Sequence, residues 1–169
     1  MLIVFGGLPG TGKTTVARAL ARQLKAAHIR VDTIEQALRS SGQLDADVGP
    51  VGYIVAYAIA EDNLSLGKTV IADSVNPLLI TRDAWLSIAE RAGVRAAEVE
   101  VICSDKIEHR HRVETRHSDV KGLIKPTWQE VIDRNYDDWA GRPIVIDTAA
   151  KSVDDVVTEL IAKLSAHSS

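Results

Sequence analysis

The sequence predicts an α/β fold, a three-layer sandwich in which helices cover both faces of a five-stranded parallel sheet. Short apolar runs typical of strands alternate along the chain with apolar stripes at helical spacing. A glycine-rich stretch, residues 7–14, lies between the first apolar run and the first helical stripe, which is a strand–loop–helix context. The 169 residues suit one domain that covers 1–169.

Strands and helices alternate through the first half of the chain. Val16, Leu20 and Leu24 share one face of the first helix, and the polar, glycine-containing stretch 40–49 ends the second. The third helix has apolar residues almost all round, so we expect it to be buried. We expect strands at 2–5, 28–31 and 69–72, and helices at 16–24, from 32 to about 40, and at 51–66.

The second half repeats this alternation with a charged interruption. A stripe of Trp85, Ile88, Ala89 and Ala92 predicts a helix that Gly93 ends. After the charged segment, Thr127 and Glu130 form a capping-box pattern. We expect the helix that they begin to bury Trp128, Val131, Ile132 and Trp139 on one face. The remaining elements are strands at 99–103 and 144–146 and a helix with the stripe 153–164.

The glycine-rich stretch carries the strongest functional signal. Gly7-Leu8-Pro9-Gly10-Thr11-Gly12-Lys13-Thr14 fits the pattern G-x-x-x-x-G-K-[ST] at every fixed position. Such a loop points backbone N–H groups into one concavity, and the N-terminus of the following helix also favours anions. Lys13 is expected to reach the β- and γ-phosphates, and the Thr14 hydroxyl to bind Mg²⁺. The motif predicts that the protein binds a nucleoside triphosphate.

Polar residues follow the predicted strands, where ligands bind in open parallel sheets. Asp32 is a candidate general base that takes the proton of an attacking hydroxyl. The alternative is structural, because Asp32 and Glu35 also fit a D-x-x-E cap of the second helix. Asp73 is a candidate Mg²⁺ ligand, and its alternative is a turn residue at the end of a strand.

The segment from about residue 105 to 126 is rich in cationic side chains. Arg112 and Arg116 are four residues apart and would share a helix face, from which they could stabilise charge on a transferred phosphoryl group. The alternative is a solvated charged helix. His109, His111 and His117 lack the carboxylate or cysteine partners of a zinc pattern, so we do not interpret them as ligands.

Composition excludes several classes of protein. The chain has 20 basic and 23 acidic side chains and a net charge of −3, so no general field attracts nucleic acid or anionic lipid. The single Cys103 cannot form an internal disulfide. The longest apolar run, 51–60, has half the length of a membrane span. No secretory signal precedes the first strand, so we expect a cytoplasmic protein without a membrane partner.

Together these residues resemble the P-loop small-molecule kinases: the shikimate, gluconate and adenylylsulfate kinase group, with antibiotic phosphotransferases and polynucleotide 5′-kinases as relatives. The resemblance covers nearly the whole chain and implies the strand order 2-3-1-4-5 and a mobile lid at about 105–126. Asp32 is similar to the acceptor-binding aspartate of the sugar and shikimate enzymes. Asp73, Asn76 and Arg82 resemble the D-x-x-N…R stretch of the polynucleotide kinases, which implies a place near metal and acceptor.

The resemblance also implies roles for the second half of the chain. Arg112 and Arg116 match the R-x-x-x-R of the family's lid, and Arg142 and Thr148 belong to loops similar to those that sandwich adenine. The catalytic residues expected are Lys13, Asp32, Arg112 and Arg116, the metal ligands Thr14 and Asp73, and the substrate residues Asp32, Asn76 and Arg82. The nucleotide-binding residues expected are Gly7, Leu8, Pro9, Gly10, Thr11, Gly12, Lys13, Thr14, Thr15, Arg142 and Thr148.

The leading hypothesis is an ATP- and Mg²⁺-dependent kinase that phosphorylates a hydroxyl of a metabolite or antibiotic. One alternative is a nucleoside or polynucleotide 5′-hydroxyl kinase, which the weak overall charge does not favour. Another is a nucleotide-binding regulatory protein without phosphotransfer. A GTPase pattern D-x-x-G occurs at 119–122, but it lies in the polar lid segment, and the sequence contains no N-K-x-D.

Overall fold

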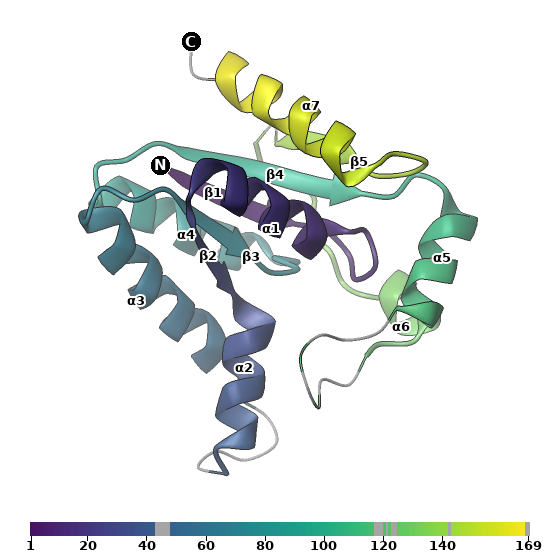
Figure 1. The fold of residues 1–169 in the computed structure, drawn as a ribbon. Helices are drawn as coiled ribbons and strands as arrows, with labels where there is room; N and C mark the ends of the chain where they lie inside the picture. The colour runs from purple at the N-terminus through teal and green to yellow at the C-terminus, as the bar shows by residue number, and fades with distance from the viewer. Residues whose placement is uncertain (43–47, 117–119, 121, 123–124, 142, 168–169) are drawn as a thin grey trace.

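A five-stranded, all-parallel sheet forms the centre of the computed structural model, in the order β2-β3-β1-β4-β5 (Figure 1). The structure describes all residues except 43–47, 117–119, 121, 123–124, 142 and 168–169. The strands are β1 (Leu2–Gly6), β2 (Ala27–Arg30), β3 (Val70–Asp73), β4 (Ala96–Ile102) and β5 (Ile144–Asp147). Both the predicted α/β class and the predicted strand order are confirmed.

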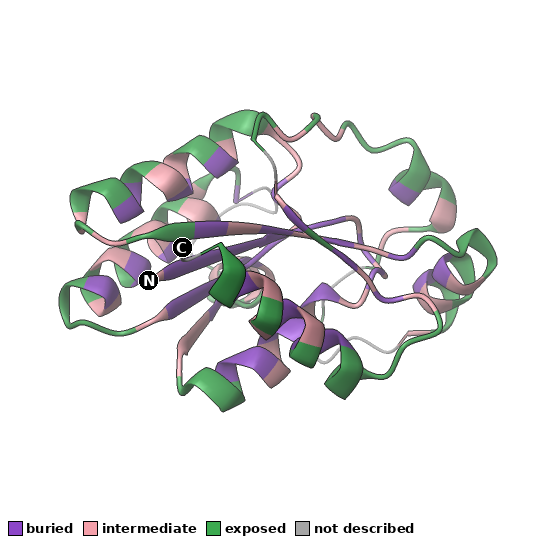
Figure 2. Ribbon diagram, turned by 90° about the horizontal axis from the view of Figure 1, so that it is seen from above, coloured by how far each residue is buried: buried purple, intermediate pink, exposed green. Residues whose placement is uncertain are grey.

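Helices cover both faces of this sheet and its carboxyl edge. The described helices are α1 (Lys13–Leu24), α2 (Val31–Ser40), α3 (Val51–Ser65), α4 (Leu79–Arg91), α5 (Lys106–Thr115), α6 (Trp128–Ile132) and α7 (Val153–Ala166). Alternate residues of β1 point to opposite faces, so Ile3 and Phe5 pack with α1 and α7, whereas Leu2 and Val4 pack with α3 and α4. Purple buried stripes mark these contacts in Figure 2. No described helix is long and apolar enough to cross a membrane.

Two elements begin earlier than the sequence predicted. α4 starts at Leu79, ahead of the apolar stripe that begins at Trp85, because Leu79 and Ile80 are exposed and add nothing to the buried apolar pattern. β4 starts at Ala96 rather than at residue 99, since Ala96 and Glu98 pair with β1 although neither is buried. Sheet pairing, which the apolar pattern does not reveal, extends this strand.

Two predicted buried faces are wrong. In α3 only Gly52, Ala56, Ala60 and Leu64 are buried, because one side of the helix meets the sheet, and Ile54 is 57% exposed. In α6 the capping box of Thr127 and Glu130 forms as predicted, but the helix ends at Ile132.

Of the expected inner face of α6, Val131 is the one buried residue, and Trp128 is half-buried against His109. Val131 is buried, whereas Ile132 is 49% exposed. Trp139 lies beyond the end of the helix, where it packs over Arg82.

Candidate active site

The glycine-rich loop connects β1 to α1 at the carboxyl edge of the sheet, as the motif requires. Gly7 has a φ of 136°, and a Cβ there would lie 2.2 Å from the Val101 carbonyl oxygen. Gly10 has a φ of 88°, and a Cβ there would lie 2.4 Å from Cγ2 of Val113. Only glycine fits either position, so the loop conformation depends on the motif residues themselves.

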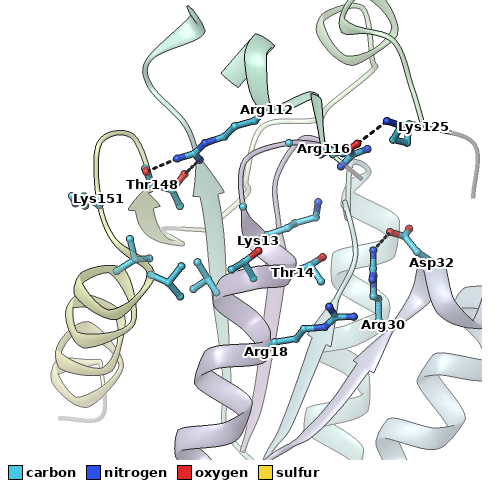
Figure 3. Close-up of a pocket in the computed structure, with 16 residues that line it drawn as sticks. Lys13, Thr14, Arg18, Arg30, Asp32, Arg112, Arg116, Lys125, Thr148 and Lys151 are labelled. Atoms are coloured by element: carbon cyan, nitrogen blue, oxygen red, sulfur yellow. Dashed lines mark hydrogen bonds and ion pairs between the residues drawn. The ribbon is translucent and has the colours of Figure 1, made fainter. Parts of the chain in front are cut away.

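A cavity of about 470 Å³ opens above this loop (Figure 3). Six of the expected nucleotide-binding residues line it: Gly10, Gly12, Lys13, Thr14, Thr15 and Thr148. Gly7, Leu8, Pro9 and Thr11 build the turn without lining the cavity. Arg142, the remaining expected residue, lies outside the described part of the chain. The structure thus brings Thr148 into one site with the glycine-rich loop, although at least 134 positions of sequence separate them.

Lys13 is the first residue of α1 and is 8% exposed. Burial lowers the pKa of its ammonium group, and the charges of Asp73 and Asp32 oppose that lowering. The group is therefore a desolvated cation lining the cavity, whose charged form the two carboxylates favour. An incoming phosphate oxygen would find little water to displace around it.

Thr14, which lines the cavity, contacts the buried Asp73 at the end of β3. The Thr14 hydroxyl donates to Oδ1 of Asp73 over 3.2 Å, and Nε2 of His28 lies 3.1 Å from Oδ2. Burial alone would raise the pKa of Asp73, but the His28 hydrogen bond and the Lys13 charge hold it below its ordinary value. An ionised carboxylate beside a hydroxyl oxygen fits Mg²⁺, which prefers oxygen ligands.

His28 is a site residue that sequence reasoning missed, although a signal existed. Its strand carries His28 and Arg30 two residues apart, so both side chains point to the same face of the sheet. Arg30 pairs in register with Asp73 on the neighbouring strand. A polar alternation on a strand beside a candidate metal ligand could have marked both residues.

Asp32 lines the same cavity as Lys13 and lies in the first turn of α2. The N-cap of α2 is Arg30, and no side chain makes a capping hydrogen bond there, so the capping alternative for Asp32 is wrong. The helix begins one residue earlier than expected, which moves Asp32 off the cap position. Its carboxylate instead pairs with Arg30 over 3.4 Å and remains 40% exposed.

Arg112 and Arg116, the two arginines that the sequence analysis singled out, lie at different ends of the cavity. Arg112 donates to the side-chain and main-chain oxygens of Thr148 over 2.8 and 3.1 Å and pairs with Glu108. Arg116, at the end of α5, has a pKa that burial lowers and the charge of Asp32 supports. Arg112 therefore belongs to the Thr148 end and Arg116 to the Asp32 end.

A buried histidine anchors α5 to the glycine-rich loop. Nε2 of His109 lies 2.9 Å from the Pro9 carbonyl oxygen, and Trp128 packs edge-on against the imidazole at 5.1 Å between ring centroids. Together with the contact of Val113 on Gly10, this bond docks the helix that carries both arginines. Among the described residues no cluster of three metal-ligating side chains exists, and His109 serves packing.

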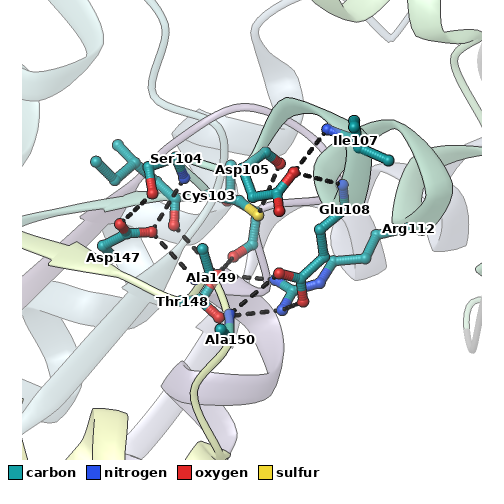
Figure 4. A network of polar contacts seen from close by, with 12 residues as sticks. Cys103, Ser104, Asp105, Ile107, Glu108, Arg112, Asp147, Thr148, Ala149 and Ala150 are labelled. Atoms are coloured by element: carbon teal, nitrogen blue, oxygen red, sulfur yellow. Dashed lines mark hydrogen bonds and ion pairs between the residues drawn. The ribbon is translucent and has the colours of Figure 1, made fainter.

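The loop after β5 closes the Thr148 end of the cavity (Figure 4). The Thr148 hydroxyl donates to the Thr11 carbonyl over 2.7 Å. Asp147 accepts from the backbone and side chain of Ser104 over 3.0 and 2.5 Å, and Glu108 accepts from the backbone of Ala150. These bonds hold three loops from the carboxyl edge in fixed positions. Ser104 and Asp147 are polar residues that follow strands, a pattern visible in the sequence, whereas nothing in the local sequence predicted the bond of Glu108 to the backbone of Ala150.

The structure does not bring Asn76 and Arg82 to this cavity. The Asn76 side chain donates to the Phe5 carbonyl over 2.7 Å and accepts from Trp85.

Arg82 is 1% exposed and sits 4.3 Å from the centroid of the Trp139 ring. Its guanidinium donates to four carbonyl oxygens, those of Asn76, Pro77, Asp137 and Asp138. Both side chains are occupied in holding the turn after β3 against the loop before β5.

Comparisons with known proteins agree with this geometry. A family model described as an AAA domain matches residues 2–134, which span every element from β1 to α6. Among curated proteins, a shikimate kinase from Corynebacterium efficiens is 28% identical over 180 residues, with 96% of each chain covered.

Two solved structures extend the agreement to the whole fold. A gluconokinase from Sinorhizobium meliloti has a TM-score of 0.65 and 22% identity, and covers 96% of this chain and 90% of its own. Chaetomium thermophilum Kti12 in complex with ADP-AlF3 has a TM-score of 0.69 and 21% identity, and the match covers 96% of this chain and 98% of the Kti12 chain. At such identities these matches show the fold alone. With the family match, they confirm the predicted resemblance to P-loop kinases.

Proposed function

The chain belongs to the AAA domain family, and from that premise we propose that it is an ATP-dependent phosphotransferase that phosphorylates a hydroxyl of a small molecule. The observation that carries the proposal is that Lys13 and Asp32, from two different strand ends, line one cavity. A nucleotide-binding protein without transfer would need the lysine and no carboxylate facing it across the cavity.

Binding of the triphosphate would use the backbone of the glycine-rich loop and the buried ammonium of Lys13. Thr14 and Asp73 would hold Mg²⁺, which when bound neutralises charge on the phosphate oxygens. At the other end, Thr148 and Arg112 would fix the nucleoside, because their mutual hydrogen bonds already position the loop after β5.

Transfer would proceed in line from the nucleotide to the acceptor. Asp32 would take the proton of the acceptor hydroxyl as its oxygen bonds to the γ-phosphorus, while the bond from that phosphorus to the β-phosphate oxygen breaks and ADP leaves. The Arg116 guanidinium, whose charge interacts with that of Asp32, would stabilise the transferred group. Arg30 would hold the Asp32 carboxylate toward the acceptor through their ion pair.

The test is transfer of label from γ-labelled ATP to a panel of metabolites, antibiotics and oligonucleotides bearing free 5′-hydroxyls. We expect label on a small molecule and none with the Lys13→Ala variant. Label on oligonucleotides alone would replace the proposal with the polynucleotide alternative. Tight nucleotide binding without transfer to any member would favour a regulatory protein.

A further inference from the structure

A histidine from β2 adjoins the two proposed Mg²⁺ ligands, Thr14 and Asp73. β2 and β3 pair in parallel, and His28 is in register with Ile71, two positions before Asp73 on the neighbouring strand. Residues two apart on a strand point to the same face of the sheet, and Ile71 packs with the core on the α1 side. His28 and Asp73 therefore share the face that α1 covers, and Thr14 is the second residue of that helix.

Two hydrogen bonds connect His28 to the cavity through Asp73. Nε2 of His28 lies 3.1 Å from Oδ2 of Asp73, and the Thr14 hydroxyl donates to Oδ1 over 3.2 Å. Thr14 is the member of this chain of contacts that lines the cavity. Asp73 is 1% exposed, and the His28 side chain is 18% exposed. His28 thus lies behind the carboxylate and can act on a bound metal only through it.

The direction of both hydrogen bonds follows from the charge of the carboxylate. The pKa of Asp73 lies below its ordinary value, so the group is ionised at neutral pH and accepts without donating. The His28 ring must therefore carry a proton on Nε2 and donate it to Oδ2. The single hydroxyl proton of Thr14 points to Oδ1, so the lone pairs of its oxygen point away from Asp73. Oxygen lone pairs are what Mg²⁺ requires of a ligand.

The direction of an aspartate carboxylate depends on its partners. Its terminal torsion joins an sp³ carbon to an sp² carbon and has a broad, roughly two-fold distribution. In this protein one partner comes from α1 and the other from β2, so each oxygen of Asp73 is held from a different element. Without the His28 bond the carboxylate could turn, and the proton of Thr14 would lose its fixed acceptor.

We propose that His28 is a positioning residue of the Mg²⁺ site, which fixes the Asp73 carboxylate so that Thr14 presents its hydroxyl oxygen to the metal. This inference rests on the proposed function, which assigns Mg²⁺ to Thr14 and Asp73. In this role His28 touches neither the metal nor the nucleotide. The loss of such an outer hydrogen-bond partner typically lowers metal affinity by about 10–100-fold.

A purely structural role for His28 predicts a different result. Burying the Asp73 carboxylate costs free energy unless the charge is hydrogen-bonded, and His28 could serve only to offset that cost. Its removal would then lower the melting temperature and leave the metal affinity of the folded protein unchanged. The two roles therefore differ in the Mg²⁺ dependence of nucleotide binding.

A binding experiment measures this dependence without phosphoryl transfer. Mg²⁺ is titrated into the protein with a fluorescent, hydrolysis-resistant ATP analogue, and the Mg²⁺ concentration for half-maximal nucleotide binding is determined. We expect His28→Leu, which has similar bulk and no donor, to raise this concentration at least about tenfold. His28→Gln, whose amide carries an N–H donor close to the position of Nε2, should restore most of the lost affinity.

The matched control is His167→Leu, which removes an exposed histidine at the end of α7 and should behave as the wild type. A double variant tests the coupling to Asp73. In the Asp73→Asn background His28→Leu should add little, because the carboxylate that His28 positions is already absent. Should His28→Leu not fold, His28→Asn takes its place, since its shorter side chain holds the amide away from Oδ2, and it should show the same loss.

The outcomes separate this inference from the proposed function. A raised Mg²⁺ requirement in Asp73→Asn beside a wild-type requirement in His28→Leu overturns the positioning role and leaves the metal site. Equal losses in His28→Leu and His28→Gln, or losses that add fully in the double variant, also overturn it. A loss in His28→Leu that His28→Gln restores supports the inference, and a labelled-ATP screen without any acceptor would then overturn the kinase alone.

Discussion

The hydroxyl of Thr14 lies 3.2 Å from Oδ1 of Asp73, so the loop and β3 present two oxygen ligands at one point. Nε2 of His28 lies 3.1 Å from Oδ2, the other carboxylate oxygen, so both oxygens of this buried carboxylate have a partner. Between them these residues define the place where a metal bound to the triphosphate would contact the protein. The arrangement accounts for the depressed pKa of a carboxylate that is 1% exposed.

We predict that Asp73→Asn raises the Mg²⁺ concentration needed for half-maximal nucleotide binding by about tenfold or more, because a charged ligand is replaced by a neutral one. Titration of Mg²⁺ against the fluorescence of a labelled ATP measures this. Asp62→Asn, an exposed change on α3, is the matched control and should behave as the wild type. An unaltered Mg²⁺ requirement in Asp73→Asn would remove Asp73 from the metal site.

Substitutions of Arg112 and Arg116 should impair the enzyme in different ways. Arg112 contacts Thr148, so Arg112→Ala should raise the KM for ATP with a small effect on kcat. Arg116 lies toward Asp32, so Arg116→Ala should lower kcat by about 10²-fold or more, in the range for loss of a transition-state contact, with little change in ATP affinity. Steady-state kinetics of both variants, which give kcat and the KM for ATP, test these two expectations. Equal losses in binding and turnover for Arg116→Ala would make it a binding residue.

Arg82 should prove structural rather than substrate-binding. Arg82→Met leaves four carbonyl oxygens without their donor in a buried place, which should lower the free energy of unfolding by roughly 3 kcal/mol. Urea unfolding measures the change. At a temperature where the variant is folded, the KM values for ATP and acceptor should match the wild type. A raised acceptor KM with unchanged stability would restore the role that the family resemblance implied.

Nucleotide affinity should depend on pH through Lys13. Burial lowers the pKa of this group from its ordinary 10.5, so its charge is lost at a lower pH than that of a free lysine. ATP affinity should therefore decline as the pH rises toward 10.5, at a lower pH than a free lysine would produce, and Lys13→Arg, which stays charged, should show a flat profile. Equilibrium titrations with labelled ATP across this range provide the measurement, and a wild-type affinity as flat as that of Lys13→Arg would contradict it.

The same shift has a consequence for stability with the opposite sense. Since the folded-state pKa of Lys13 lies below the unfolded-state value, the unfolded chain binds more protons between the two values. The contribution of Lys13 to the free energy of unfolding thus rises with pH across that window. A bound triphosphate, which favours the charged ammonium, reverses this effect.

The sheet and the loop could be predicted from sequence because their signals are local. Gly7 to Thr14 and the apolar runs around them define a strand, a turn and a helix without reference to distant residues. Asp32 and Asp73 also lie just after or at the ends of their strands, where the topology required polar residues. Predicting the positions of these two residues required only the rule that parallel strands end at one edge of the sheet.

Other parts of the site depend on contacts that no local pattern contains. Arg82 was misplaced because its partners are backbone carbonyls near Asp137, which any sequence could supply. The opposite placement of Arg112 and Arg116 follows from the end of α5 at Thr115, because Arg116 has a non-helical ψ of 141° and leaves the helix face of Arg112. The helix itself is docked by His109 on Pro9, a contact across a hundred residues. His28 and Arg30, in contrast, followed from the period of two in β2 and could have been predicted.

The central claim is that Asp32 faces the acceptor hydroxyl while the loop around Lys13 holds the triphosphate, and the rate of label transfer in a single turnover by Asp32→Asn tests it most directly. With the acceptor identified in the labelled-ATP screen, we predict a transfer rate about 10²–10⁴-fold below the wild type, the loss typical of a general base. The ATP dissociation constant and melting temperature should be unchanged, because Asp32 does not cap α2. A variant that transfers label at the wild-type rate would contradict the account.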